Sequence, residues 1–121
     1  MQKGEFQHNV LVWTQACFGP QISADVSERT HRFFEEAAEL AQAAGCTADE
    51  AHRLVDYVFD RPKGDIAQEV GGVLLTLAAL CTSLDLLMHC AGEQELTRVW
   101  AKLPRIRAKQ AAKPQNSPLP A

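Results

Sequence analysis

The chain has 121 residues, of which 46% are hydrophobic and 22% are charged. This composition is typical of one globular domain and excludes a disordered or collagen-like chain. The formal net charge of −3 gives no general attraction to polyanions, so we expect no nucleic-acid partner. The four cysteines lie far apart and form no zinc-binding pattern, and no apolar signal segment opens the chain. Both features favour a cytoplasmic protein with reduced thiols.

Two helices are expected in the first part of the chain. Apolar residues recur at three- and four-residue spacing over residues 6–18, which predicts a helix that Gly19 and Pro20 stop. The run Asp25-Val26-Ser27-Glu28 has the form of a capping box and predicts the start of a second helix. Gly45 is expected to end this helix, because glycine tolerates the left-handed conformation of a helix end.

The next two helices are predicted from the same kinds of signal. Thr47-Ala48-Asp49-Glu50 repeats the capping pattern and predicts a short helix to about Phe59. A turn at Arg61-Pro62-Lys63-Gly64 follows. A fourth helix is then expected from Asp65 to about Cys90, and it is apolar on nearly all sides between residues 70 and 80.

A fifth helix is expected from Glu93, with a break or kink at Pro104. The segment after residue 112 is rich in proline, which predicts a disordered tail over residues 113–121. No strand signal appears. The sequence therefore predicts an all-α bundle of about four to five helices over residues 1–112.

The run Glu35-Glu36-Ala37-Ala38-Glu39 places three carboxylates on one side of the second helix. An ordinary solvated helix face has the same pattern. On the fourth helix, Asp65 and Glu69 share a stripe with Gly72, and Glu69 leads directly into the apolar run. Clustered carboxylates suit hard cations such as Mg²⁺ or Mn²⁺. A salt bridge from Glu69 to Arg29 or Arg32 is the competing interpretation.

The run from Arg32 to Leu40, which reads RFFEEAAEL, resembles the E-E-x-x-E helix of the MazG-like, all-α nucleoside triphosphate pyrophosphohydrolases. In that family a second motif, E-x-x-D, follows on a later apolar helix. Here the matching stretch is Glu69-Val70-Gly71-Gly72, which keeps the glutamate but has Gly72 in place of the aspartate. The resemblance covers the chain from about Trp13 to Cys81.

The resemblance implies that Glu36, Glu39 and Glu69 bind Mg²⁺ or Mn²⁺. Glu35 would be an auxiliary acid, and either Glu35 or Asp65 would accept the proton of the attacking water. The glycine at position 72 removes one anionic ligand, and Asp65 or a water molecule would have to fill its place.

The reaction implied by the family is hydrolysis of a nucleoside triphosphate to a monophosphate and pyrophosphate. The phosphates need cations, and Arg32, Lys63 and Lys102 are the candidates. The alternative is a catalytically degenerate scaffold that binds nucleotide or metal, or only assembles. A di-iron bundle is disfavoured, because only Glu28-Arg29-Thr30-His31 has the required E-x-x-H form.

The fourth helix also predicts self-association. A chain this short has few other helices with which to surround a helix that is apolar on all sides, so we expect a homodimer or homotetramer. The apolar run is shorter than the roughly 20 residues that span a bilayer, and we expect no membrane partner. Gly71 and Gly72 would permit close backbone approach or make room for a ligand.

Overall fold

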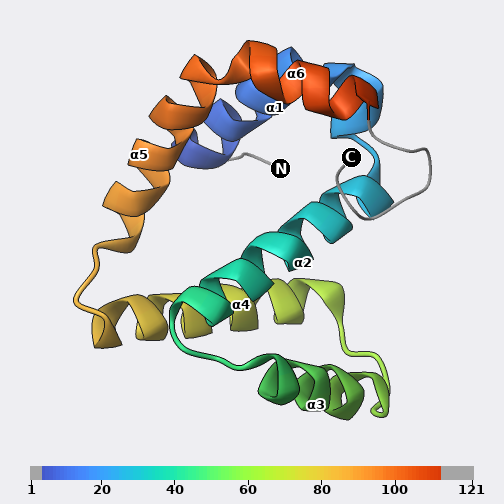
Figure 1. The fold of residues 1–121 in the computed structure, drawn as a ribbon, viewed down its shortest axis with the longest axis vertical. Helices are drawn as coiled ribbons and strands as arrows, with labels where there is room; N and C mark the ends of the chain where they lie inside the picture. Colours follow the sequence, from blue (N-terminus) through green and yellow to red (C-terminus); the bar gives the residue numbers. More distant parts are fainter. Residues whose placement is uncertain (1–3, 113–121) are drawn as a thin grey trace. The chain divides into compact units, whose positions relative to one another are not determined.

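The computed structural model describes residues 4–112 and contains six helices and no strand within this range. The helices, in chain order, are α1 (Glu5–Ser23), α2 (Val26–Ala43), α3 (Ala48–Phe59), α4 (Ile66–Ser83), α5 (Met88–Ala101) and α6 (Leu103–Ala112) (Figure 1). The all-α prediction is confirmed. The tail predicted over residues 113–121 lies outside the described residues.

The chain divides into two compact units. The terminal unit comprises residues 4–34 and 89–112 of the described chain, and the central unit comprises residues 35–88. Helix α2 begins in the terminal unit and ends in the central unit, so its acidic run belongs to the central unit.

Local capping groups start the helices of the central unit. The Thr47 hydroxyl accepts the Glu50 backbone N–H at 3.2 Å, and the Glu50 carboxylate accepts the Thr47 backbone N–H at 2.9 Å, which forms the predicted capping box of α3. Asp65 is the N-cap of α4, where its Oδ2 accepts the Gln68 backbone N–H at 3.0 Å. These contacts lie within four residues of each other, so they do not depend on tertiary packing.

The end of α2 follows the prediction, whereas the end of α4 does not. Gly45 closes α2 with φ of 106°. Helix α4 ends at Ser83 and not near Cys90, because Asp85 adopts φ of 57° and the Leu86 N–H donates to the Cys81 carbonyl at 2.8 Å. Aspartate is one of the few residues that visit this conformation without severe strain.

The first and fifth helices also differ from the predicted bounds. Helix α1 is interrupted at Gly19, as predicted, but continues after Pro20 to Ser23. Helix α5 begins at Met88 rather than at Glu93, and Gly92 lies inside it. A Cβ at Gly92 would lie 3.2 Å from the Phe6 ring, so the glycine makes room for this aromatic side chain.

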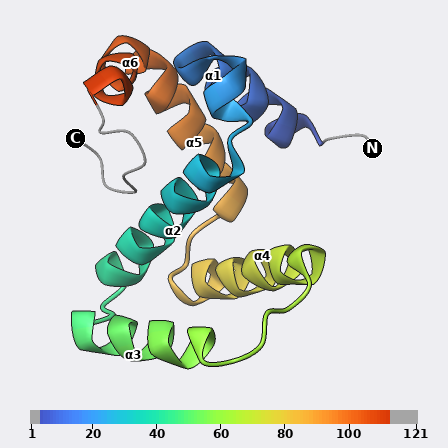
Figure 2. The same cartoon turned by 90° about the vertical axis from the view of Figure 1, so that its right-hand side faces the viewer.

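The terminal unit holds both buried residues of the described chain, Thr14 and Cys17 of α1. Helix α6 packs beside α1 (Figures 1 and 2). The Arg107 guanidinium donates to the Ala16 carbonyl, with a distance of 2.9 Å from Nε. This contact joins α6 to a helical carbonyl just before the break at Gly19. Burial raises the pKa of the Cys17 thiol, against the opposing charge of Arg107.

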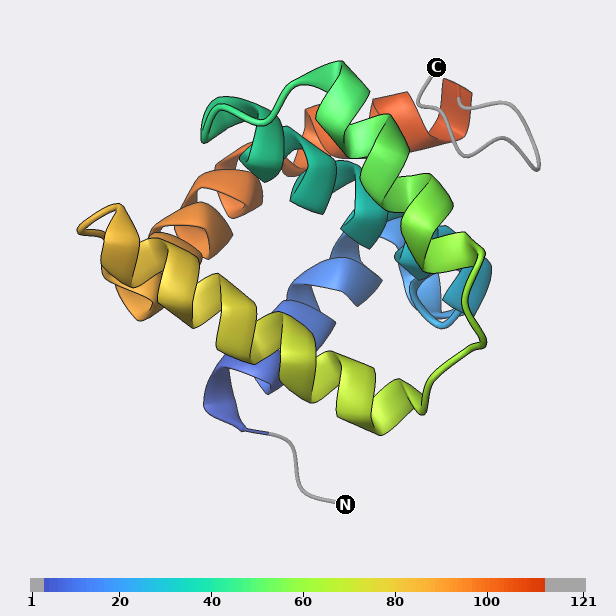
Figure 3. The same cartoon turned by 90° about the horizontal axis from the view of Figure 1, so that it is seen from below.

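The central unit contains no buried residue. Figures 2 and 3 show α3 and α4 as separate rods joined by the loop over residues 60–65. Helix α4 is the one helix within residues 4–112 that is long and apolar enough to cross a membrane, judged by length and composition alone. Many of its large apolar side chains are exposed in the single chain, with Leu75 74% exposed.

Candidate metal site

The three carboxylates of the first motif lie on α2. Glu36 and Glu39 are exposed and Glu35 is half-buried. Their spacing of three and four residues places Glu39 one turn after the other two, on the same side of the helix. The structure thus confirms that these three residues share a helix, which is the element that the sequence predicted for them.

The two acids of the fourth helix lie at its N-terminus. Asp65 caps α4, so one of its carboxylate oxygens is already engaged with the backbone. Glu69 lies in the first turn of α4, and its carboxylate lies over the preceding loop. A Cβ built at Gly64 would be only 2.5 Å from Glu69 Oε2. Glu69 is exposed. The apolar run that follows Glu69 therefore does not desolvate its carboxylate in a single chain.

The five acids do not form a site within one copy. Within residues 4–112, no group of three or more histidine, cysteine, aspartate or glutamate residues lies close enough to hold a metal ion. Helices α2 and α4 do not pack extensively against each other. The donors fit Mg²⁺ or Mn²⁺ in chemistry, since all are carboxylate oxygens, but the geometry of one copy does not fit the ion.

Space is available at Gly72, which stands where the E-x-x-D motif of the MazG-like pyrophosphohydrolases has aspartate. A Cβ built at Gly72 meets no atom within 4 Å, and the same holds for Gly71. Asp65 precedes Gly72 by seven residues, which corresponds to about 10 Å along a helix. Because Asp65 also caps the helix, it does not occupy the position that the missing aspartate would hold.

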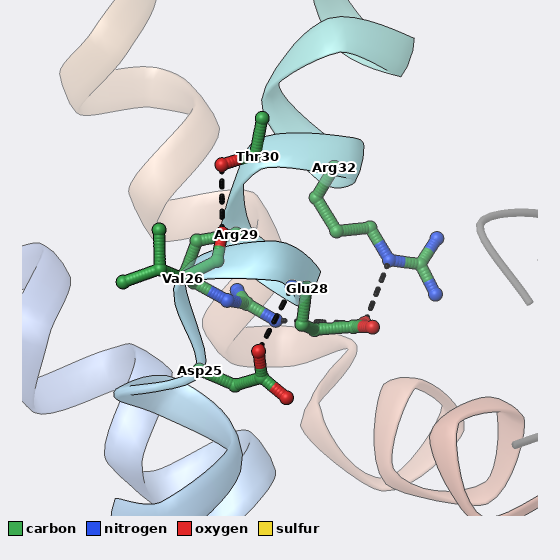
Figure 4. Close-up of polar contacts among 6 residues, drawn as sticks. All are labelled: Asp25, Val26, Glu28, Arg29, Thr30 and Arg32. Carbon is green, nitrogen blue, oxygen red and sulfur yellow. Dashed lines mark hydrogen bonds and ion pairs between the residues drawn. The ribbon is translucent and has the colours of Figure 1, made fainter. Parts of the chain in front are cut away.

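Arginines of the terminal unit surround Glu28 at the start of α2 (Figure 4). Arg29 Nη2 and Arg32 Nε lie 3.7 and 3.4 Å from Glu28 Oε1, and Asp25 Oδ1 accepts the Glu28 backbone N–H at 3.2 Å. The Arg29 guanidinium also lies 4.8 Å from the centre of the Phe18 ring. Burial lowers the pKa of Arg29, and the charge of Glu28 opposes this shift.

These contacts bear on the competing salt-bridge interpretation, in which Arg29 or Arg32 pairs with Glu69. Both arginines lie beside Glu28 instead. Within residues 35–88, no lysine or arginine lies within salt-bridge distance of Glu69. The other proposed phosphate ligands are Lys63, which is exposed in the loop before α4, and Lys102, which is half-buried between α5 and α6.

Charge is divided unevenly between the two units. The central unit has ten acidic residues and three lysines or arginines, whereas the rest of the chain has five acidic residues and nine lysines or arginines. The formal charges are therefore −7 and +4. The net charge of the whole chain does not show this division. Summing the formal charge over successive segments of the sequence would have shown it. An acidic unit attracts cations, and a basic unit attracts phosphates.

No protein-family model matches the chain, and no curated protein and no solved structure shows significant similarity to it.

Proposed function

We propose that this protein is a cytoplasmic, divalent-metal-dependent nucleoside triphosphate pyrophosphohydrolase that cleaves ribo- or deoxyribonucleoside triphosphates to monophosphates and pyrophosphate. One observation carries the proposal. The central unit presents three glutamates within two turns of α2 and a further glutamate in the first turn of the apolar helix α4, in a segment with a formal charge of −7.

The residues of the proposed site have separate roles. Glu36, Glu39 and Glu69 would hold Mg²⁺ or Mn²⁺, and the ion would offset the negative charge of the substrate phosphates. This role requires the acids of α2 and α4 to come closer together than they are in the single chain. Glu35 or Asp65 accepts the proton of the attacking water, and one oxygen of Asp65 also caps α4. The cations proposed for the phosphates are Arg32, Lys63 and Lys102.

The proposal is tested by measuring pyrophosphate release from each nucleoside triphosphate with Mg²⁺ or Mn²⁺. We expect Glu36→Gln to lower the rate by about 100-fold or more, since loss of even an outer partner of a metal site costs 10- to 100-fold. Glu93→Gln is the matched control, because Glu93 is an exposed helical glutamate outside the site. Equal rates in both variants would contradict the proposal.

The second candidate function is a non-catalytic scaffold, which the glycine at position 72 favours. Gly72→Asp restores the ligand of the family motif in open space. If the protein is a hydrolase with one ligand fewer, this variant binds Mn²⁺ about 10-fold more tightly and turns over faster. Gly71→Asp adds the same charge one residue away and is the control. Mn²⁺ binding without pyrophosphate release in any of these proteins would support the scaffold.

A further inference from the structure

A carbonyl of α1 lacks its helical partner because of the proline within that helix. In a regular α-helix the Ala16 carbonyl would accept the backbone N–H of residue 20, but residue 20 is proline and has no N–H. Proline also disfavours the helical conformation of the residue before it, and Gly19 has φ of 77° and ψ of 165°. The Ala16 carbonyl therefore needs a donor from elsewhere in the chain.

Arg107 of α6 supplies this donor. Its Nε donates to the Ala16 carbonyl oxygen at 2.9 Å, and its Nη2 donates to the same oxygen. The two residues are 91 positions apart along the chain. Among the helices within residues 4–112, α1 and α6 are the pair that packs extensively (Figures 1 and 2). The bond thus fixes α6 at the point where α1 is broken.

Helix α6 is too short and too positively charged to be stable without α1. It has ten residues, whereas isolated helices shorter than about 12–15 residues are marginal in water. It contains Arg105, Arg107 and Lys109 and no acidic residue. Arg105 and Lys109 are like charges four positions apart, which destabilises a helix. None of the ten residues is buried. The order of α6 therefore depends on its contact with α1.

Docking of α6 leaves one of its own polar atoms without a partner. Gln110 Oε1 is buried and accepts no hydrogen bond within the part of the chain that the structure describes. A buried polar atom of this kind destabilises the state that buries it, and it regains hydrogen bonds where water reaches it. Gln110 therefore favours separation of α6 from α1, whereas the Arg107 bond opposes it.

We infer that α6 is a strap that opens and closes over α1, and that Pro20 keeps the Ala16 carbonyl free to accept from Arg107 at each closure. Lys102 is the hinge, because it is the single residue between α5 and α6. Helix α5 has a separate contact with α1, between Gly92 and the Phe6 ring, so α6 can open while α5 stays in place. The strap does not depend on the proposed hydrolase.

The strap adjoins the two buried residues of the described chain, Thr14 and Cys17. Cys17 follows Ala16 directly, and the charge of Arg107 acts on its thiol, because it opposes the rise in pKa that burial causes. Opening of α6 should therefore bring water and reagents to Cys17. The thiol serves as a reporter of the opening in a chain whose other three cysteines are replaced by alanine.

The first experiment measures amide exchange in the native chain by mass spectrometry at increasing, non-denaturing concentrations of urea. A strap that opens alone exposes little surface, and exchange through such an opening depends weakly on urea. The amides of α6 should exchange at least about 10-fold faster than those of α1 and α5, with little change on addition of urea. Exchange of α6 at the same rate as α1 and with the same dependence on urea would overturn the inference.

The second experiment tests the role of the proline through the rate at which N-ethylmaleimide labels Cys17. Arg107→Ala should raise this rate about fivefold, which is the factor that corresponds to a hydrogen bond of about 1 kcal/mol. In a Pro20→Ala background, the backbone N–H of residue 20 is present and can donate to the Ala16 carbonyl. Arg107→Ala should then change the rate by less than about twofold.

The matched background is Pro62→Ala, which removes an exposed proline from the loop before α4 and does not affect Ala16. Here Arg107→Ala should keep its full effect. Equal effects of Arg107→Ala in the Pro20→Ala and Pro62→Ala backgrounds would contradict the strap, as would a Cys17 labelling rate that Arg107→Ala does not change. If Pro20→Ala loses its helical circular dichroism, the exchange of α6 in the native chain decides alone.

Discussion

The two units of this protein differ in whether their helices bury side chains against each other. The terminal unit packs α6 against α1, buries Thr14 and Cys17, and joins the two helices through Arg107. The central unit has well-capped helices but no buried residue. The difference between the two units shows that a segment can have well-defined helix caps without having a buried core. Local capping groups define where a helix starts, whereas contacts between helices bury its apolar face and supply most of its stability.

The largest effect is expected from a charge on the uncovered face of α4. If the central units associate, as the sequence predicts, Leu75→Asp should raise the dissociation constant of the oligomer by more than about 100-fold, because desolvating an unpaired carboxylate costs several kcal/mol. Light scattering and circular dichroism measure the assembly and the helix content. Gln68→Glu adds the same charge at an exposed polar position of α4 and should leave both unchanged. If Leu75→Asp also leaves them unchanged, the central unit is not an interface.

A smaller effect is expected in the terminal unit. Arg107→Ala removes the side-chain donor of the Ala16 carbonyl and should lower the free energy of unfolding by about 1 kcal/mol. Urea denaturation measures this loss. Arg105→Ala is the control, since Arg105 is an exposed arginine of the same helix. Equal losses in the two variants would show that the Arg107 contact does not hold α6 to α1.

The smallest effect concerns the cap of α3. Hydrogen bonds from the Thr47 backbone N–H and hydroxyl lower the pKa of Glu50 in the folded protein. A depressed pKa contributes stability above the ordinary pKa of glutamate, about 4.3, and this stability is lost as pH falls through the folded value. Amide exchange in α3 should therefore increase relative to the other helices below about pH 4.3.

The matched variant for this prediction is Glu50→Gln, which keeps the side-chain length and removes the titration. In this variant, the amide exchange of α3 should not increase relative to that of the other helices below about pH 4.3. An identical pH dependence in the wild type and in Glu50→Gln would show that another group controls the stability of α3.

The starts of α2, α3 and α4 were predictable because the cap of each helix lies within a few residues along the chain. The runs beginning at Asp25, Thr47 and Asp65 start helices as expected. The end of α4 was predicted wrongly, since hydrophobic periodicity continues through Leu84 and Leu87 and gives no warning of the left-handed Asp85. Glycine is the usual signal of such an end, and none is present there.

The candidate site was predictable only as a set of residues on named helices. The spacing of Glu36 and Glu39 placed them on one side of α2, and Glu69 was expected at the start of the apolar helix. That α2 and α4 remain apart within one copy was not predictable. A sequence pattern defines the face on which a side chain lies, but not the surface that this face meets.

The sequence by itself determined the helical class, the capped helix starts and the separation of acidic from basic residues, because these depend on neighbours along the chain. The tertiary structure decided which apolar faces are covered. Helices α1 and α6 meet within one chain, and many large apolar residues of α2, α3 and α4 remain exposed. The physical reason is that burial depends on the geometry of the connections and on the available partner surfaces, neither of which hydrophobic periodicity encodes.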